Sequence, residues 1–235
     1  MSGTAEVDVV VVGGGPAGAA AAAYLAAVGL DVTVVDRQEF PRDKVCGDFV
    51  GPTALVELER LGVSDEPRFA AANKVRRAAL FLDGKRMIIR PLPKVAGLPS
   101  YGRTIPRTSL DAWVLDAARR AGATVVEGAK VTGFTRSAGR VDVTYERGSA
   151  SRTLRTSVLV GADGSSSTVA RAVRGGAAPP RQDRILAVRA YAEGVSGPAD
   201  RADLFFSSAL ASPTSRGSPP PTRCAAPRCS STGSA

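Results

Sequence analysis

The alternation of apolar and polar residues near the N-terminus predicts a strand, a glycine turn, a helix and a second strand. Val7–Val12 is a valine-rich run, as expected of a parallel strand buried on both faces. Ala17–Val28 is rich in alanine, a strong helix former, and Gly29 follows it at a favoured helix-ending position. Asp31–Val35 then has the pattern of the second strand. This order of elements indicates an α/β fold with a parallel sheet.

Further along the chain, the same patterns predict two more helices, a hairpin and a series of short strands. The hairpin turns at "DG", Asp83-Gly84, a dipeptide that suits the φ > 0 positions of a tight turn. A turn and a short helix are expected in "GADGSSSTVARAV". The predicted helices are Pro52–Leu61 and Ser109–Ala121, and the predicted strands are Ala78–Leu82, Met87–Ile89, Thr124–Glu127, Val131–Arg136, Val141–Tyr145, Thr153–Val160, Ala187–Ala192 and Asp203–Phe206.

The chain changes character after Leu210. Its last 25 residues, 211–235, contain no large aliphatic residue, aromatic residue, acid or lysine, so we expect disorder there. Two explanations stay open, a natural low-complexity tail and a frameshift in a GC-rich gene. We expect a nucleotide-binding domain over 1–180 with an inserted hairpin region around 75–105, then the first strands of an incomplete second domain over 181–210.

Composition narrows the classes of function. The net charge is +9, but the basic residues are scattered and not interleaved with aromatic residues, which argues against nucleic-acid binding. The chain has three cysteines without metal-ligand spacing and no histidine, which argues against a zinc site and a histidine-dependent triad. No apolar run is long enough to span a membrane and no secretory signal is recognisable, so we expect a cytoplasmic protein with peripheral membrane contact at most.

The first motif with chemical content is Gly13-x-Gly15-x-x-Gly18, between a predicted strand and a predicted helix. In this context Gly13 permits the tight turn, Gly15 lets a pyrophosphate approach the backbone, and Gly18 lets the helix pack closely on the strand. The free N–H groups of the helix N-terminus would hold the phosphates. Asp36, at the end of the second strand, is placed to accept hydrogen bonds from ribose hydroxyls. The motif predicts dinucleotide binding without separating FAD from NAD.

Two further segments stand out. "VLVGADGSSSTVAR" puts Asp163-Gly164 at the end of an apolar strand, either near the ligand edge of the sheet or merely as a cap for the next helix. "EFPRDKVCGD" sets Cys46 among charged residues and beside Gly47, where an ordinary buried thiol would be unusual. Nearby Arg42 and Lys44 would favour a thiolate, and glycine allows close backbone approach to a ring. We interpret Lys44 as a structural or phosphate contact.

In their order and spacing, "GGGPAGAAAAAYLA", "DRQEFPRDKVCGD", "YGRTIPRTSLDAWVLDAARRAGA" and "GADGSSSTVAR" resemble the geranylgeranyl reductase family of FAD-dependent oxidoreductases. That family belongs to a wider group with the p-hydroxybenzoate hydroxylase fold, which has a Rossmann-like FAD-binding domain and a β-rich substrate domain. The resemblance covers roughly residues 5 to 206, and "FPRDKVCGD" is its most specific part.

The resemblance implies an enzyme that transfers hydride from reduced FAD to an isoprenoid double bond of a lipid, quinone or chlorophyll precursor, with NADPH or a ferredoxin as electron donor. It implies Cys46 as a flavin-face residue that steers or protonates the alkene. It also implies a set of FAD contacts. These are Gly13, Gly15, Ala17 and Gly18 at the pyrophosphate, Asp36 at the adenosine ribose, Val131 at the adenine side, and Arg37, Cys46, Gly47, Arg107, Asp163 and Gly164.

The chain departs from the family pattern at its C-terminal end. An aromatic and proline-containing substrate segment is expected where "LFFSSALASPTSRG" begins, and a later "GDAAG"-type motif is missing. We therefore expect a truncated product. Two alternatives stay open: a flavin monooxygenase or halogenase of the same fold, and an FAD-binding fragment without turnover.

Overall fold

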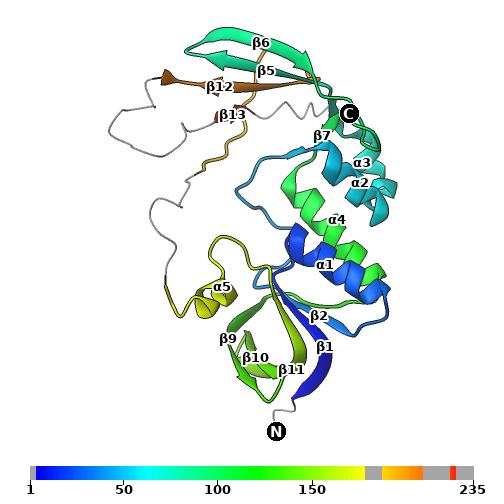
Figure 1. Ribbon diagram of the computed structural model, residues 1–235, viewed down its shortest axis with the longest axis vertical. Coiled ribbons are helices and arrows are strands. Elements are labelled where there is room, and N and C mark those ends of the chain that lie inside the picture. The colour runs from blue at the N-terminus through cyan, green and yellow to red at the C-terminus, as the bar shows by residue number, and fades with distance from the viewer. Residues whose placement is uncertain (1–3, 178–186, 209–222, 226–235) are drawn as a thin grey trace. The chain divides into compact units, whose positions relative to one another are not determined.

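The structure, a computed structural model, describes residues 4–177, 187–208 and 223–225 (Figure 1). The chain forms two compact units, and each of them is discontinuous in sequence. The first unit combines residues 1–44 with 108–180, and the second combines 45–107 with 181–235. The predicted hairpin region around 75–105 therefore belongs to the same unit as the residues after 181.

The first unit contains a six-stranded sheet in the order β8-β2-β1-β11-β10-β9. Strands β8, β2, β1 and β11 run parallel, and β10 and β9 extend the sheet as an antiparallel meander. Helix α1 connects β1 to β2. The bounds are β1 (Ala5–Val12), α1 (Pro16–Ala27), β2 (Val32–Val35), α4 (Arg107–Arg120, from the boundary of the units), β8 (Thr124–Val126), β9 (Ala129–Ser137), β10 (Arg140–Arg147), β11 (Ala150–Gly161) and α5 (Thr168–Val173).

Valine and alanine build the centre of this unit. Val10, Val11 and Val34 are completely buried, as the valine runs predict for central parallel strands. Helix α1 buries four alanines, Ala19, Ala22, Ala23 and Ala26, whose small side chains let the helix lie close to the sheet. Gly29, with φ of 89°, follows the end of α1 in the left-handed conformation that glycine adopts without strain. The predicted β-α-β start of the chain is confirmed.

The described residues of the second unit form two small sheets and three short helical segments. One sheet has the order β3-β7-β4 and the other the order β13-β12-β5-β6. The elements are β3 (Phe49–Val50), α2 (Pro52–Arg60), the 3-10 helix η1 (Val63–Asp65), α3 (Pro67–Ala71), β4 (Asn73–Val75), β5 (Arg77–Leu82), β6 (Lys85–Pro91), β7 (Gly102–Thr104), β12 (Arg201–Phe206) and β13 (Arg223–Ala225). The hairpin predicted around Asp83-Gly84 is confirmed as β5–β6.

One prediction for this unit needs correction. The expected strand Ala187–Ala192 is wrong, because these residues form no regular element. Instead, side chains hold the segment: the Tyr191 hydroxyl donates to Asp48 at 2.9 Å. Of the tail 211–235, for which the sequence predicts disorder, the structure describes only Arg223–Ala225, which pair antiparallel with β12. The rest of that tail lies outside the described residues.

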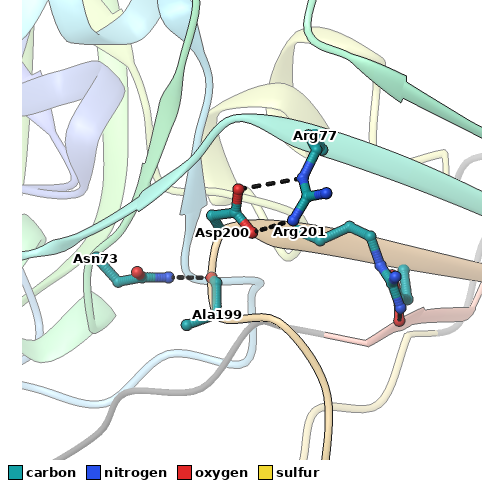
Figure 2. Close-up of polar contacts among 6 residues, drawn as sticks. Asn73, Arg77, Ala199, Asp200 and Arg201 are labelled. Carbon is teal, nitrogen blue, oxygen red and sulfur yellow. Dashed lines mark hydrogen bonds and ion pairs between the residues drawn. The ribbon is translucent and has the colours of Figure 1, made fainter.

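Strand β12 joins β5 in parallel, and a cluster of polar contacts fixes its start (Figure 2). Asp200 accepts from Arg77 through both carboxylate oxygens, at 3.1 Å from Nε and 2.7 Å from Nη2. The backbone N–H groups of Arg76 and Arg77 donate to the Asp200 carbonyl oxygen, and the Asn73 side-chain amide donates to that of Ala199. These contacts set the register of two strands that are far apart in sequence.

We expect the Asp200 contact to stabilise the second unit only above mildly acidic pH. The hydrogen bonds from Arg77 hold the pKa of Asp200 below its ordinary value. A carboxyl whose pKa is lowered in the folded state stabilises that state fully above its unfolded-state pKa of about 4 and loses this contribution as pH falls through the folded pKa. Asp200→Asn should therefore lower the free energy of unfolding at neutral pH, by less than about 1 kcal/mol because the pair is half exposed to solvent.

Urea unfolding followed by circular dichroism, from neutral pH to about pH 3, measures this difference. The difference in free energy of unfolding between the wild-type chain and Asp200→Asn should shrink below about pH 4 and then vanish. Asp31→Asn, a change at an exposed carboxylate of the first unit, is the control and should show no such pattern. A difference that persists unchanged in acid would contradict the assignment.

Candidate functional site

The glycine loop after β1 is shaped by close backbone approach. Gly13 has φ of 102°, and a Cβ there would lie 2.5 Å from the Ala162 carbonyl oxygen. A Cβ on Gly18 would lie 1.9 Å from the Gly13 carbonyl oxygen. Gly15 differs, because its φ of −67° suits any residue and the nearest atom to an added Cβ is a side-chain nitrogen at 3.5 Å. Gly13 and Gly18 are therefore needed for packing, whereas Gly15 keeps the surface of the loop open.

Helix α1 begins directly at this loop. Gly15 is its N-cap residue, so no side chain accepts from the first N–H groups, and Pro16 occupies a first-turn position that needs no donor. No acidic residue lies in the first turn to offset the positive end of the helix. The N-terminus of α1 is therefore built to receive an anionic group.

Asp36 holds the loop in place from the end of β2. Its Oδ2 accepts from the backbone N–H of Gly14 at 2.6 Å, and its Oδ1 accepts from that of Gln38 at 2.8 Å. The carboxylate is buried but lines the cavity described below, and each oxygen retains a lone pair. Asp36 can therefore accept from a sugar hydroxyl while it orders the glycine loop, a structural role that its sequence position does not reveal.

Asp163 and Gly164 lie after β11, which is the parallel neighbour of β1 on the side opposite β2. Asp163 accepts from the Ser167 hydroxyl and, at 2.5 Å, from the backbone N–H of Thr168. These contacts cap α5, so the capping interpretation of this motif is confirmed. Both residues also line the cavity, and Gly164 has φ of 81°. The motif thus combines a structural cap with a position at the site.

A cavity of about 350 Å³ lies at the carboxyl ends of β1, β2 and β11. Ligands in open α/β sheets bind at this position, where neighbouring strands connect in opposite directions. Among the predicted site residues, Ala17 and Gly18 do not line the cavity, and Cys46, Gly47 and Arg107 belong to the second unit. The predicted residues that do line it are Gly13, Gly15, Asp36, Arg37, Val131, Asp163 and Gly164.

Two basic side chains from "PRDK" also line this cavity. The Arg42 guanidinium lies 3.5 Å from the position of a Cβ on Gly15, and Lys44 Nζ lies 3.8 Å from the same position and 3.8 Å from that on Gly164. Arg42 is oriented by an ion pair of 3.2 Å with Asp111, which is fully buried, and it lies over the Phe40 ring. The sequence indicated Lys44 as a structural or phosphate contact but did not indicate Asp111, because that pairing depends on the folded chain.

The arrangement fits a ligand with linked phosphates and a ribose. Helix N–H groups and two cations meet at the open side of Gly15, and a carboxylate that can accept from hydroxyls lies at the end of the neighbouring strand. The crowding at Gly13 and Gly18 keeps the backbone in the shape that exposes these groups. The cavity thus has the donor set that a dinucleotide requires.

The second unit holds the Cys46 loop through Asp48. Cys46 is an exposed free thiol. Asp48 is buried and accepts from the Tyr191 hydroxyl at 2.9 Å and from the backbone N–H of Arg107 at 3.2 Å, and the Arg189 guanidinium lies 3.8 Å from it. The loop is therefore fixed to the start of α4 and to the segment around 190, a role for Asp48 that the sequence did not predict.

Comparison with known proteins agrees with this site. The profile of the FAD binding domain family matches residues 6–220. The chain is 41% identical over 169 residues to menaquinone reductase of Mycolicibacterium smegmatis, an alignment that covers 71% of this chain and 39% of that protein. It is 31% identical over 173 residues to digeranylgeranylglycerophospholipid reductase 1 of Methanothermobacter thermautotrophicus, covering 71% and 41%. The predicted resemblance is confirmed, although the chain spans only about two fifths of the length of these relatives.

Solved structures with a similar fold are flavoproteins. The flavin-dependent halogenase CmlS matches with a TM-score of 0.65 and 28% identity, covering 73% of this chain and 32% of that one. A flavoprotein/dehydrogenase from Cytophaga hutchinsonii matches with a TM-score of 0.68 and 22% identity, covering 85% and 50%. At 22% identity, the match to the Cytophaga protein shows a similar fold only. Within the parts of the chain that the structure describes, no helix has the length and apolarity needed to cross a membrane.

Proposed function

Because the chain belongs to the FAD-binding domain family, we propose that it forms the cofactor-binding part of a reductase that acts on isoprenoid double bonds. The observation that carries the cofactor assignment is the cavity in which the glycine loop, Asp36 and the basic pair Arg42 and Lys44 converge. The substrate class rests on two relatives that are named for isoprenoid-bearing substrates, menaquinone and digeranylgeranylglycerophospholipid.

Each group at the site has a specific task in this proposal. The N–H groups at the start of α1 hold the FAD pyrophosphate, Arg42 and Lys44 offset its charge, and Asp36 accepts from the adenosine ribose. Arg37 and Val131 lie at the adenosine side, and Asp163 and Gly164 border the cavity through the α5 turn. When bound, reduced FAD supplies the hydride that saturates the alkene.

Three further assignments complete the proposal and concern the second unit. Cys46 and Gly47 face the flavin ring, Arg107 reaches the cofactor, and Asp48 keeps the Cys46 loop in position through its bonds to Tyr191 and Arg107. The electron donor is NADPH or a ferredoxin. Because a polyprenyl substrate resides in membranes, the cytoplasmic enzyme would contact the membrane surface peripherally.

A flavin titration of the purified chain tests the cofactor assignment. The variant Lys44→Met tests whether FAD binds in the cavity that Lys44 lines. We expect the wild-type chain to take up FAD, seen as bound flavin absorbance. Lys44→Met should weaken binding by about 5- to 30-fold, because a charge-assisted contact to phosphate contributes roughly 1 to 2 kcal/mol at a partly exposed position. The affinity of the variant should also depend less on salt.

Lys85→Met, at an exposed lysine of β6 in the second unit, is the matched control and should leave FAD affinity unchanged. Equal FAD affinity of the wild-type chain and Lys44→Met would remove Lys44 from the site. A chain that takes up no FAD at all would refute the cofactor assignment for this polypeptide.

A chimaera tests the reaction. Residues 5–206 would replace the matching segment of the M. smegmatis menaquinone reductase, and mass spectrometry of the extracted quinone would follow the gain of two hydrogens in the polyprenyl chain. We expect the chimaera to reduce the polyprenyl chain. Cys46→Ala in the chimaera should abolish this reduction or shift it to another double bond.

The similarity to the halogenase CmlS supports a second candidate, a flavin monooxygenase or halogenase. Oxygen consumption coupled to substrate hydroxylation or halogenation, without alkene reduction, would favour it.

A further inference from the structure

The second unit has a cavity of its own, of about 330 Å³, that neither the motifs nor the proposed function uses. It lies among α2, η1, α3, the 97–99 loop and β7. Leu55, Val56 and Phe69 give it an apolar wall. Arg103 of β7 and Tyr101, the residue before that strand, also line it. Only one acid, Glu59, belongs to the lining. The cavity therefore combines an apolar surface with a guanidinium group.

Arg103 is an unusual residue for such a position. It is only 6% exposed, and Nη1 donates to the carbonyl oxygens of Ala70 at 3.0 Å and Ala72 at 2.6 Å. Its Nε is buried and has no hydrogen-bond partner among the described residues. A buried charge without a counter-ion is costly, so this guanidinium calls for an acceptor that the chain does not supply.

The neighbouring strand adds more positive charge. Lys74 of β4 lies directly opposite Arg103 in the antiparallel register, an arrangement that destabilises a sheet when both residues carry the same charge. Three cationic groups lie over the Tyr101 ring, with Lys74 Nζ at 4.7 Å from the centroid, the Arg76 guanidinium at 5.6 Å and that of Arg103 at 5.7 Å. Over the residues that the structure describes, none of these three cations forms an ion pair.

Tyr101 offsets part of this repulsion through cation–π contacts, but a ring does not neutralise three charges. We propose that this cavity binds a small organic anion, with its phosphate or carboxylate group toward Arg103 and a compact apolar body against Leu55, Val56 and Phe69. Lys74 and Arg76 do not line the cavity, but they lie over the ring of its lining residue Tyr101 and add positive charge nearby. The anion supplies the counter-charge that the guanidinium lacks and relieves the repulsion across β4 and β7. This site is independent of the FAD cavity, which belongs to the first unit.

Carbon-13 labelling of tyrosine provides a local measurement, because the chain has four tyrosines, Tyr24, Tyr101, Tyr145 and Tyr191. The protein is kept with excess FAD so that phosphates do not compete at the first cavity, and Tyr101→Phe assigns the ring signal. Phenyl phosphate, benzoate and inorganic phosphate are titrated in turn. We expect the Tyr101 signal to shift saturably with phenyl phosphate or benzoate, at least about fivefold more tightly than with inorganic phosphate, because the apolar wall contacts only the organic anions.

The relative affinities of phenyl phosphate and benzoate distinguish a phosphate site from a carboxylate site. The readout at Tyr101 does not require FAD to bind, so failure of the cofactor assignment would leave this test intact. Equal, unsaturable shifts of all four tyrosines, or no preference over inorganic phosphate, would overturn the proposal.

Variants that remove a positive or a negative charge should change phenyl phosphate affinity in opposite directions. Lys74→Met should weaken phenyl phosphate binding about fivefold, whereas Glu59→Gln should strengthen it about twofold, because it removes the one negative charge of the lining. Lys94→Met, an exposed lysine of the same unit, is the control and should change nothing. Arg103 is not substituted, because losing its bonds to two carbonyl oxygens is expected to destabilise the unit. Unchanged binding in both Lys74→Met and Glu59→Gln would refute the anion site.

Discussion

Gly18→Ala is expected to lower the free energy of unfolding of the first unit by about 3 kcal/mol or more, a large part of the stability of a typical domain. The added Cβ would lie 1.9 Å from the Gly13 carbonyl oxygen, a backbone atom that cannot rotate away. It would also meet the Ala162 side chain at 3.1 Å, so the helix, the glycine loop and the turn after β11 would all have to shift. Urea unfolding followed by the fluorescence of Trp113, the single tryptophan, measures the loss.

Two other glycines provide matched controls for the same substitution. Gly133→Ala in β9 places a Cβ in open space and should change stability by less than about 1 kcal/mol. Gly15→Ala meets no backbone atom, so the protein should fold normally but lose FAD affinity, because the methyl group would project from the loop toward Arg42 and Lys44. A stable Gly18→Ala variant with normal FAD binding would show that the loop tolerates movement that its geometry excludes.

Asp36→Ala is expected to have the second largest effect, and it should act on two measurements at once. The change leaves the backbone N–H groups of Gly14 and Gln38 without their acceptor. Losing the acceptor of a buried donor costs about 1 to 3 kcal/mol, and the Gln38 N–H, which is only partly buried, adds less. Urea unfolding without FAD should therefore show a loss of about 2 to 4 kcal/mol. FAD affinity should fall by about 100-fold, since the ribose contact and the order of the glycine loop are lost together.

Asp8→Asn serves as the control for Asp36→Ala. Asp8 also accepts from a backbone N–H, that of Asp31 at 2.9 Å, but on the exposed side of the unit, and asparagine keeps an acceptor oxygen. The stability and FAD affinity of the Asp8→Asn variant should stay near the wild-type values. If Asp36→Ala lowered FAD affinity without any loss of stability, the role of Asp36 in ordering the loop would be wrong.

The sequence predicted the parts of the fold that depend on local patterns. The valine strand β1, the alanine helix α1 and the meander β9–β11 all have continuous periodic signals, and the structure contains them. The glycine spacing and the terminal Asp36 predicted residues that line one cavity, because in a parallel sheet the carboxyl ends of the strands lie at one edge.

The remaining elements depend on contacts between distant residues. Strands β3, β4 and β7 have only two or three residues each, too few for a periodic pattern. The pairing of β5 with β12 joins residues that are far apart in sequence, such as Arg77 and Arg201, so no local sequence feature predicts it. The segment around Tyr191 looks like a strand but is held by Asp48 through side chains. For the same reason the ion pair of Arg42 with buried Asp111 could not be predicted.

The discontinuity of the two units has a consequence for synthesis. The β5–β6 hairpin leaves the ribosome well before its partner β12, which follows only after the whole C-terminal part of the first unit has been made. During that interval the hairpin carries an unpaired strand edge, and the Phe81 ring lacks the Phe205 ring of β12 on which it stacks in the folded unit. Exposed edges of this kind promote aggregation in partly folded chains. Elongation speed and chaperone access over residues 108–200 therefore influence how much folded protein the cell obtains.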